Sequence, residues 1–164
     1  VHYRNSMYAL TATGLYVHVP ATNTWAPVVG TPTTAMFHAC IHNEYLVVAR
    51  GAVNLLIRFD GTTFSTPGSQ TAQRVASYDG YLFAVEPVGA NGLIRVHRSP
   101  DNGSTWENDG LGTSSYTIRT PGGLEGGLPS PQLDPTGVCI APDGSGSMRL
   151  HVGIASGVWM PYHG

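Results

Sequence analysis

The chain has 164 residues, a formal net charge of −2 and only 11% charged residues. Its eight basic residues are all arginines, and such sparse positive charge excludes the dense basic surface that nucleic-acid binding requires. With 21 glycines and 12 prolines, long helices would be interrupted throughout, so the composition predicts an all-β protein of short strands and tight turns. No apolar run is long enough to span a membrane as a helix, and nothing in the sequence indicates a cofactor.

Three kinds of segment follow one another at the start of the chain. An apolar strand, Asn5–Leu10, is followed by a second one, Gly14–Val17, and then by Ala21–Trp25, a turn that ends in a tryptophan. The two apolar segments return twice, at 43–48 and 54–57 and again at 79–84 and 92–95. The spacing of about 37 residues is typical of one four-stranded blade of a β-propeller.

The third turn, Ser99 to Trp106, is the most specific motif and reads S-P-D-N-G-S-T-W. Asp101 can accept hydrogen bonds from backbone N–H groups ahead of it, Gly103 supplies a position with positive φ, and Thr105 leads into the next strand. The motif resembles the Asp-box, S-x-D-x-G-x-T-W, of bacterial neuraminidase repeats. The resemblance implies a β-propeller of four-stranded antiparallel blades, in which these motif residues are structural.

This register predicts one propeller domain, or a segment of one, with four blades. The turns at 21–25 and 60–64 hold the place of the Asp-box, so that Trp25, Phe64 and Trp106 begin the fourth strands and pack as blade anchors. The blades are assigned to residues 1–35, 36–73, 74–136 and 137–164. The last lacks a fourth strand. Either residues near Val1–Arg4 complete it in a four-bladed ring, or the chain belongs to a larger propeller, which we favour.

The third blade is longer than the period requires. Residues 108–136, which include G-G-L-E-G-G-L-P-S-P, are predicted to form a long loop between the fourth strand of this blade and the next blade. Long loops in compact domains are usually functional or disordered. By the resemblance, such connections and the loops between second and third strands form the ligand-binding face, whereas the Asp-boxes lie on the opposite rim.

Six residues of these loops are candidates for ligand binding: Arg50, Arg74, Glu86, Tyr116, Arg119 and Glu125. Sialidases hold the substrate carboxylate with three arginines, so the resemblance points to Arg50, Arg74 and Arg119. The sequence departs from that family because it lacks the Arg-Ile-Pro motif and keeps one complete Asp-box. Contacts with solvent or loop carbonyls are the commoner role of such arginines. We therefore predict no catalytic residue.

The histidines and cysteines predict neither a metal site nor a disulfide. His38 and His42 are four residues apart, which on a strand is about 13 Å along the chain and too far for a shared metal ion. Cys40 and Cys139 fall in the first strands of blades that are not neighbours, and their side chains point to opposite strand faces. We expect two buried free thiols.

The predicted function is that of a non-catalytic β-propeller module, binding or structural, with a glycan or protein partner. The lysine-free, low-charge composition suits secreted proteins and virus or phage surfaces. The sequence starts without methionine or signal peptide, so we expect a processed product or a piece of a longer protein, with other chains closing the propeller. The alternatives are a sialidase-like glycoside hydrolase and a purely structural scaffold subunit, which an exposed apolar patch on an open blade would favour.

Overall fold

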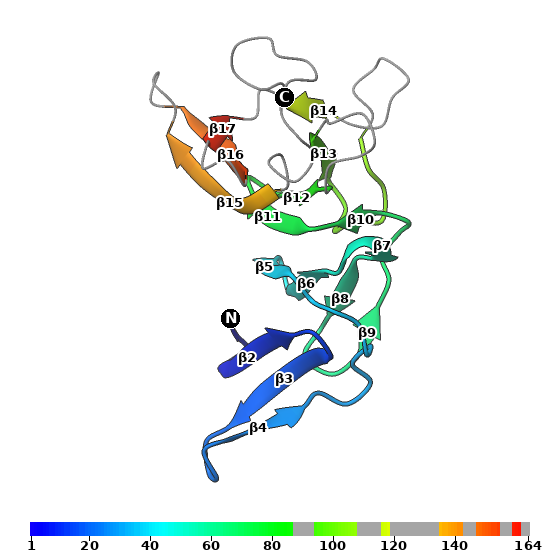
Figure 1. The fold of residues 1–164 in the computed structure, drawn as a ribbon, viewed down its shortest axis with the longest axis vertical. Helices are drawn as coiled ribbons and strands as arrows, with labels where there is room; N and C mark the ends of the chain where they lie inside the picture. Colours follow the sequence, from blue (N-terminus) through cyan, green and yellow to red (C-terminus); the bar gives the residue numbers. More distant parts are fainter. Residues whose placement is uncertain (87–93, 108–115, 119–134, 143–146, 155–158, 162–164) are drawn as a thin grey trace.

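The computed structural model describes residues 1–86, 94–107, 116–118, 135–142, 147–154 and 159–161. These residues form strands and no helix (Figure 1), so the all-β prediction is confirmed. They build three four-stranded antiparallel sheets, one three-stranded sheet and one two-stranded sheet. Within this described part of the chain, no helix has the length and apolar character needed to cross a membrane.

The four larger sheets follow the chain, and we number them 1 to 4. Sheet 1 contains β1 (His2–Tyr3), β2 (Ser6–Thr11), β3 (Gly14–Val19) and β4 (Thr24–Pro27). Sheet 2 contains β5 (His38–His42), β6 (Tyr45–Ala49), β8 (Ile57–Phe59) and β9 (Phe64–Ser65). Sheet 3 contains β11 (Arg74–Tyr78), β12 (Tyr81–Val85), β13 (Ile94–Ser99) and β14 (Tyr116–Ile118), and sheet 4 contains β15 (Pro135–Pro142), β16 (Met148–Ile154) and β17 (Trp159–Pro161). The small sheet pairs β7 (Gly51–Leu55) with β10 (Thr71–Ala72).

The predicted long loop at 108–136 contains all of β14 and the start of β15, so this prediction is wrong there. The fourth strand of sheet 3 is β14, so the prediction that Trp106 begins it is also wrong. β14 pairs with β13, with Val96 opposite Tyr116, and β15 begins at Pro135. Just before the predicted loop, the Glu107 N–H donates to the Arg98 carbonyl at 2.8 Å. The aromatic and β-branched triplet at 116–118 favours a strand, and the surrounding glycines and prolines hid that signal.

Two-residue turns join the first two strands of sheets 1, 2 and 3 and fix how these sheets correspond. The turns are Arg4–Asn5, Asn43–Glu44 and Asp79–Gly80. In the first and third turns both residues have positive φ, which matches the twist of the flanking strands. The first residues of these turns are Arg4 and Asn43, so Arg4 corresponds to Asn43. The sequence repeat aligned Asn5 with Asn43 because both are asparagines, and this alignment is one residue out of register.

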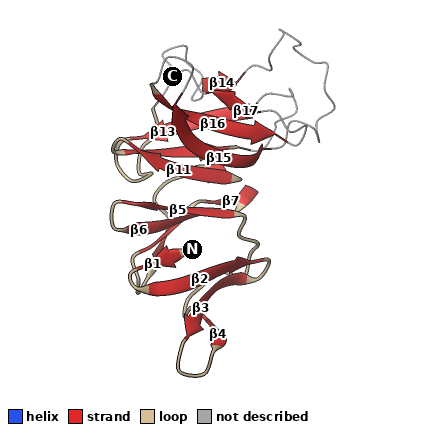
Figure 2. Ribbon diagram, turned by 90° about the vertical axis from the view of Figure 1, so that its left-hand side faces the viewer, coloured by secondary structure: helices blue, strands red, loops and turns tan. Residues whose placement is uncertain are grey.

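The sheets succeed one another along the molecule, from sheet 1 at one end to sheet 4 at the other (Figures 1 and 2). β11 lies beside β5 on one side and β15 on the other, so the first strands of sheets 2, 3 and 4 are neighbours. The described residues form an open series rather than a closed ring (Figure 1). The propeller therefore stays a prediction.

Two hydrophobic clusters fill the spaces on either side of sheet 2. The first joins sheets 1 and 2 and includes Tyr3, Tyr8, Leu15, Leu46, Val48, Ile57 and Phe59. The second joins sheets 2 and 3 and includes Val47, Ala49, Leu56, Val75, Leu82 and Ala84. Alternate residues of β6 thus face opposite neighbours, which explains its continuous apolar sequence.

Candidate functional site

The turn at Ser99–Trp106, which follows β13 of sheet 3, is closed by hydrogen bonds. Asp101 accepts the backbone N–H of Thr105 at one carboxylate oxygen and its hydroxyl at the other, both at 2.7 Å. Gly103, with a φ of 89°, donates its N–H to the Ser99 hydroxyl at 2.8 Å. The donors on Thr105 are the main cause of a lowered pKa for Asp101. These groups are engaged in holding the turn.

The shorter turn of sheet 2 keeps the same carboxylate arrangement. Asp60 accepts the backbone N–H groups of Thr62 and Thr63 at 2.8 and 2.7 Å, and the Thr63 hydroxyl at 2.9 Å. These bonds lower the pKa of Asp60, with the Thr63 N–H as the largest cause. This shorter turn is therefore closed by the same kind of carboxylate hydrogen bonds as the Asp101 turn.

The turn at Ser99–Trp106 also contacts the preceding sheet, because Arg58 of β8 donates to the Asn102 carbonyl at 3.4 Å. A Cβ added to Gly68, which follows β9 of sheet 2, would lie 2.7 Å from the Gly103 carbonyl oxygen and 3.6 Å from the Trp106 ring nitrogen. Trp106 itself packs against the cluster between sheets 2 and 3. In sheet 2, Phe64 packs against the cluster between sheets 1 and 2. Each of these aromatic residues therefore anchors its sheet to the one before it.

Two of the three candidate arginines donate to nearby backbone carbonyls, Arg50 from the connection between β6 and β7 and Arg74 from the first position of β11. Arg50 Nε donates to the Leu55 carbonyl at 2.9 Å, and its Nη1 donates to the Thr34 hydroxyl at 3.2 Å. Arg74 Nη1 donates to the Gln73 carbonyl at 2.9 Å. Desolvation lowers the pKa of both guanidinium groups. The third arginine, Arg119, lies outside the described residues.

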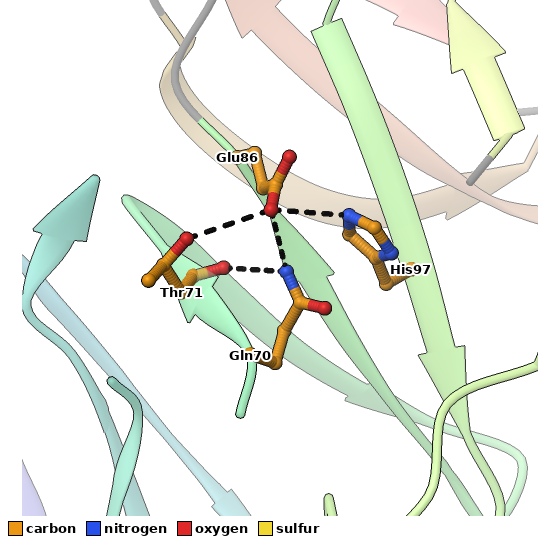
Figure 3. A network of polar contacts seen from close by, with 4 residues as sticks. All are labelled: Gln70, Thr71, Glu86 and His97. Atoms are coloured by element: carbon orange, nitrogen blue, oxygen red, sulfur yellow. Dashed lines mark hydrogen bonds and ion pairs between the residues drawn. The ribbon is translucent and has the colours of Figure 1, made fainter. Parts of the chain in front are cut away.

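Glu86 is the centre of a polar network at the end of β12 (Figure 3). Its Oε1 accepts the Gln70 amide at 2.7 Å and the Thr71 hydroxyl at 3.5 Å, and it lies 3.4 Å from His97 Nε2. The His97 side chain is 5% exposed and that of Glu86 is 23% exposed. Glu86 directly follows the second strand of sheet 3, as Arg50 does in sheet 2. Glu86 thus holds the segment that leads into sheet 3, and Arg50 holds the segment that leads into sheet 2.

The structure does not assemble the remaining candidates into one site. Tyr116 lies in β14 rather than in a connection between sheets, so its predicted placement is wrong. Arg119 and Glu125 lie outside the described residues. Across the residues described, no group of three or more histidine, cysteine, aspartate or glutamate side chains could hold a metal ion.

The two histidines of β5 connect sheet 2 to sheet 3. His42 Nδ1 lies 2.8 Å from the Ser77 hydroxyl, and His38 Nδ1 accepts the Val75 N–H at 3.5 Å. Desolvation lowers the pKa of both rings. On the same face, burial raises the pKa of Cys40 to about 12.

Both cysteines are free, but Cys139 is exposed rather than buried. The sequence repeat placed Cys139 in a strand, but it did not show which other segments cover that strand. The exposure of Cys139 could therefore not be predicted.

A hollow lies on the outer face of sheet 1, and sequence reasoning missed it. It has a volume of about 310 Å³ and is lined by Ala9, Thr11, Thr13, Tyr16 and Trp25. Trp25 is 47% exposed, so the expectation that it packs between sheets is wrong in the described structure. Its ring lies 5.2 Å from that of His18. If the repeat had been aligned on its two-residue turns, the alternation of side chains along β2 and β3 would have shown that these residues share one face of sheet 1.

Comparison with known proteins finds no family model and no curated sequence that matches the chain.

Proposed function

We propose that the sheets are blades of a β-propeller and that the protein is a non-catalytic module that binds or supports a partner. The joint between successive sheets carries this proposal. Phe64 anchors sheet 2 on sheet 1 as Trp106 anchors sheet 3 on sheet 2. Repetition of one joint in chain order is how propeller blades succeed one another. The working surfaces are then blade faces and loop rims, in an extracellular or virion-surface setting.

The contacts of the candidate residues support a module without hydrolase chemistry. A sialidase-like site needs arginines that converge on the substrate carboxylate with short, charge-assisted bonds. Arg50 and Arg74 instead hold loop groups at 2.9 to 3.2 Å. The Asp101 carboxylate already accepts two hydrogen bonds from Thr105 within its own turn. An incoming carboxylate would have to displace these intramolecular partners.

A fluorogenic sialoside assay tests the absence of catalysis. We expect no turnover above buffer between about pH 4 and pH 8, the range in which carboxyl and imidazole groups titrate. Turnover that disappears in Arg74→Ala, while the variant keeps its circular dichroism spectrum, would overturn the proposal in favour of a glycoside hydrolase.

Glycan recognition at the hollow of sheet 1 is a second candidate function. Tyr16 and Trp25 offer aromatic rings beside the hydroxyls of Thr11 and Thr13, and such rings combine an apolar body with a polar tip. A glycan array tests it. Binding that is lost in Trp25→Ala and kept in Val53→Ala, a change at a residue 90% exposed on β7, would support this function.

A further inference from the structure

The outer face of sheet 1 corresponds to the face by which each later sheet packs on its predecessor. Counted from the two-residue turns, Met7 of β2 takes the place of Leu46 and Leu82, and Ala9 takes the place of Val48 and Ala84. The four residues of sheets 2 and 3 are 0% exposed, whereas Met7 is 54% exposed. The position of Met7 is therefore exposed in sheet 1, whereas the corresponding positions in sheets 2 and 3 are buried.

The third strands extend this correspondence. Tyr16 pairs with Ala9 as Ile57 pairs with Val48 and His97 with Ala84. Ile57 and His97 are 3% and 4% exposed, and both lie between sheets. Tyr16 instead lines the hollow.

The fourth strand of sheet 1 shows the same correspondence. Trp25 lies opposite His18 as Phe64 lies opposite Phe59, so it stands where Phe64 anchors sheet 2. Phe64 packs on sheet 1, but Trp25 is 47% exposed. Among the described residues, no sheet packs on Trp25 as sheet 1 packs on Phe64.

We propose that the outer face of sheet 1 docks a second copy of this chain, with sheet 4 of that copy as the preceding member of the series. This inference rests on the proposed function, because it extends the joint between blades to two chains. Sheets 1 and 4 lie at opposite ends of the molecule (Figures 1 and 2), so each copy can offer one end to the other. Such a head-to-tail contact closes into a ring or continues as a filament.

The chemistry of the face fits a β-sheet better than a charged ligand. Its residues carry no carboxylate, ammonium or guanidinium group: Met7, Ala9, Thr11, Tyr16, His18 and Trp25. Sheets 1 and 2 offer apolar side chains such as Tyr8 and Val47 to the sheets that follow them. A partner sheet of that kind would fill the hollow and desolvate Trp25, and a buried tryptophan is a typical centre of binding energy.

Sedimentation velocity of the full chain tests the docking. Between about 1 µM and 100 µM, a range that covers ordinary protein association, the wild type should form larger species as concentration rises. Trp25→Glu and Ala9→Arg should each weaken association at least about tenfold, the effect of losing a hot-spot residue. The matched control Val53→Glu, off this face, should associate like the wild type. A monomer at every concentration, or association unchanged by both face variants, would overturn the proposal.

Cross-linking tests which sheet of the second copy docks. In Ala9→Cys, a short bis-maleimide should join position 9 of one copy to the exposed Cys139 of another, and Cys139→Ser in the same background should abolish this product. A product linking position 9 to position 9 would show that two first sheets meet and would overturn the head-to-tail arrangement. Mass spectrometry of the digested product identifies the linked positions.

Failure of the docking and failure of the proposed function give different results. A monomer that binds a glycan through Trp25 overturns the docking and leaves a non-catalytic binding module. Sialoside turnover overturns the proposed function, whatever the state of association.

Discussion

Thr105 donates its backbone N–H and its hydroxyl to the two carboxylate oxygens of Asp101, both at 2.7 Å. Asp60 and Thr63 repeat this pairing in a turn that is one residue shorter. The pairing of aspartate with threonine, rather than the full motif, is therefore what the two turns share. Because the Asp101 turn lies against Gly68, in the connection that follows β9 of sheet 2, it also influences how sheets 2 and 3 fit together.

Loss of the Asp101 carboxylate should weaken the fold. In Asp101→Ala the N–H and hydroxyl of Thr105 lose their acceptor, and we expect the free energy of unfolding to fall by about 1 to 2 kcal/mol. Urea unfolding followed by circular dichroism measures this change. Asp79→Asn, at a turn position that tolerates asparagine, is the control and should change stability by less than about 0.5 kcal/mol.

Acid should destabilise the protein through the same carboxylates. The pKa of Asp101 and of Asp60 is lowered in the folded state, so the stability they provide is present above the unfolded carboxyl pKa and is lost as pH falls through the folded value. Thermal melts between about pH 5 and pH 2 should show a falling midpoint. Asp101→Asn should flatten part of this dependence. A slope identical to that of the wild type would contradict the assignment.

The histidines of β5 should add a separate loss of stability nearer neutrality. Desolvation lowers the pKa of His38 and His42 in the folded state, so the unfolded chain binds protons more readily once pH falls below about 6.5. The free energy of unfolding should decrease between about pH 7 and pH 5, before the carboxylates titrate. His42→Gln should reduce this slope in urea titrations, and an unchanged slope would count against His42.

The contact between Gly68 and the Asp101 turn should not tolerate a larger side chain. A Cβ at Gly68 would lie 2.7 Å from the Gly103 carbonyl oxygen, which belongs to the backbone and cannot swing aside. Gly68→Ala should cost about 1 to 3 kcal/mol in the free energy of unfolding, as overpacking does. Ser69→Ala, at the exposed neighbouring position, should leave it nearly unchanged. Equal melting temperatures for the two variants would exclude a tight joint.

Trp106 and Trp25, which the repeat in the sequence aligned, should differ in their effect on stability. Trp106 packs between sheets 2 and 3, so Trp106→Ala should cost about 2 kcal/mol or more. Trp25 is 47% exposed on the outer face, and Trp25→Ala should change the stability of the monomer by less than about 1 kcal/mol. Chemical denaturation at low protein concentration makes the comparison. Comparable losses would mean that Trp25 is buried in the monomer.

The sequence predicted the short apolar strands that follow tight turns, because strand composition and turn chemistry are local properties. β6 and β12 correspond to the predicted apolar segments 43–48 and 79–84, which also include the turn residues before each strand. The outer face of sheet 1 was not, because the repeat was aligned on Asn5, and a shift of one residue exchanges the two faces of a strand. Tyr116 was placed in a loop because glycines and prolines surround its short strand. The contacts of Arg50 and Glu86 depend on loops from other parts of the chain, which no local pattern shows.

The alternation within β6 has a consequence for how such a chain can change over evolution. Leu46 and Val48 shape the contact with sheet 1, and Val47 and Ala49 shape the contact with sheet 3. Neighbouring codons thus specify two different interfaces, and a substitution that alters the fit of one leaves the residues of the other untouched. A five-residue strand therefore allows the angle between one pair of sheets to drift while the next pair keeps its geometry.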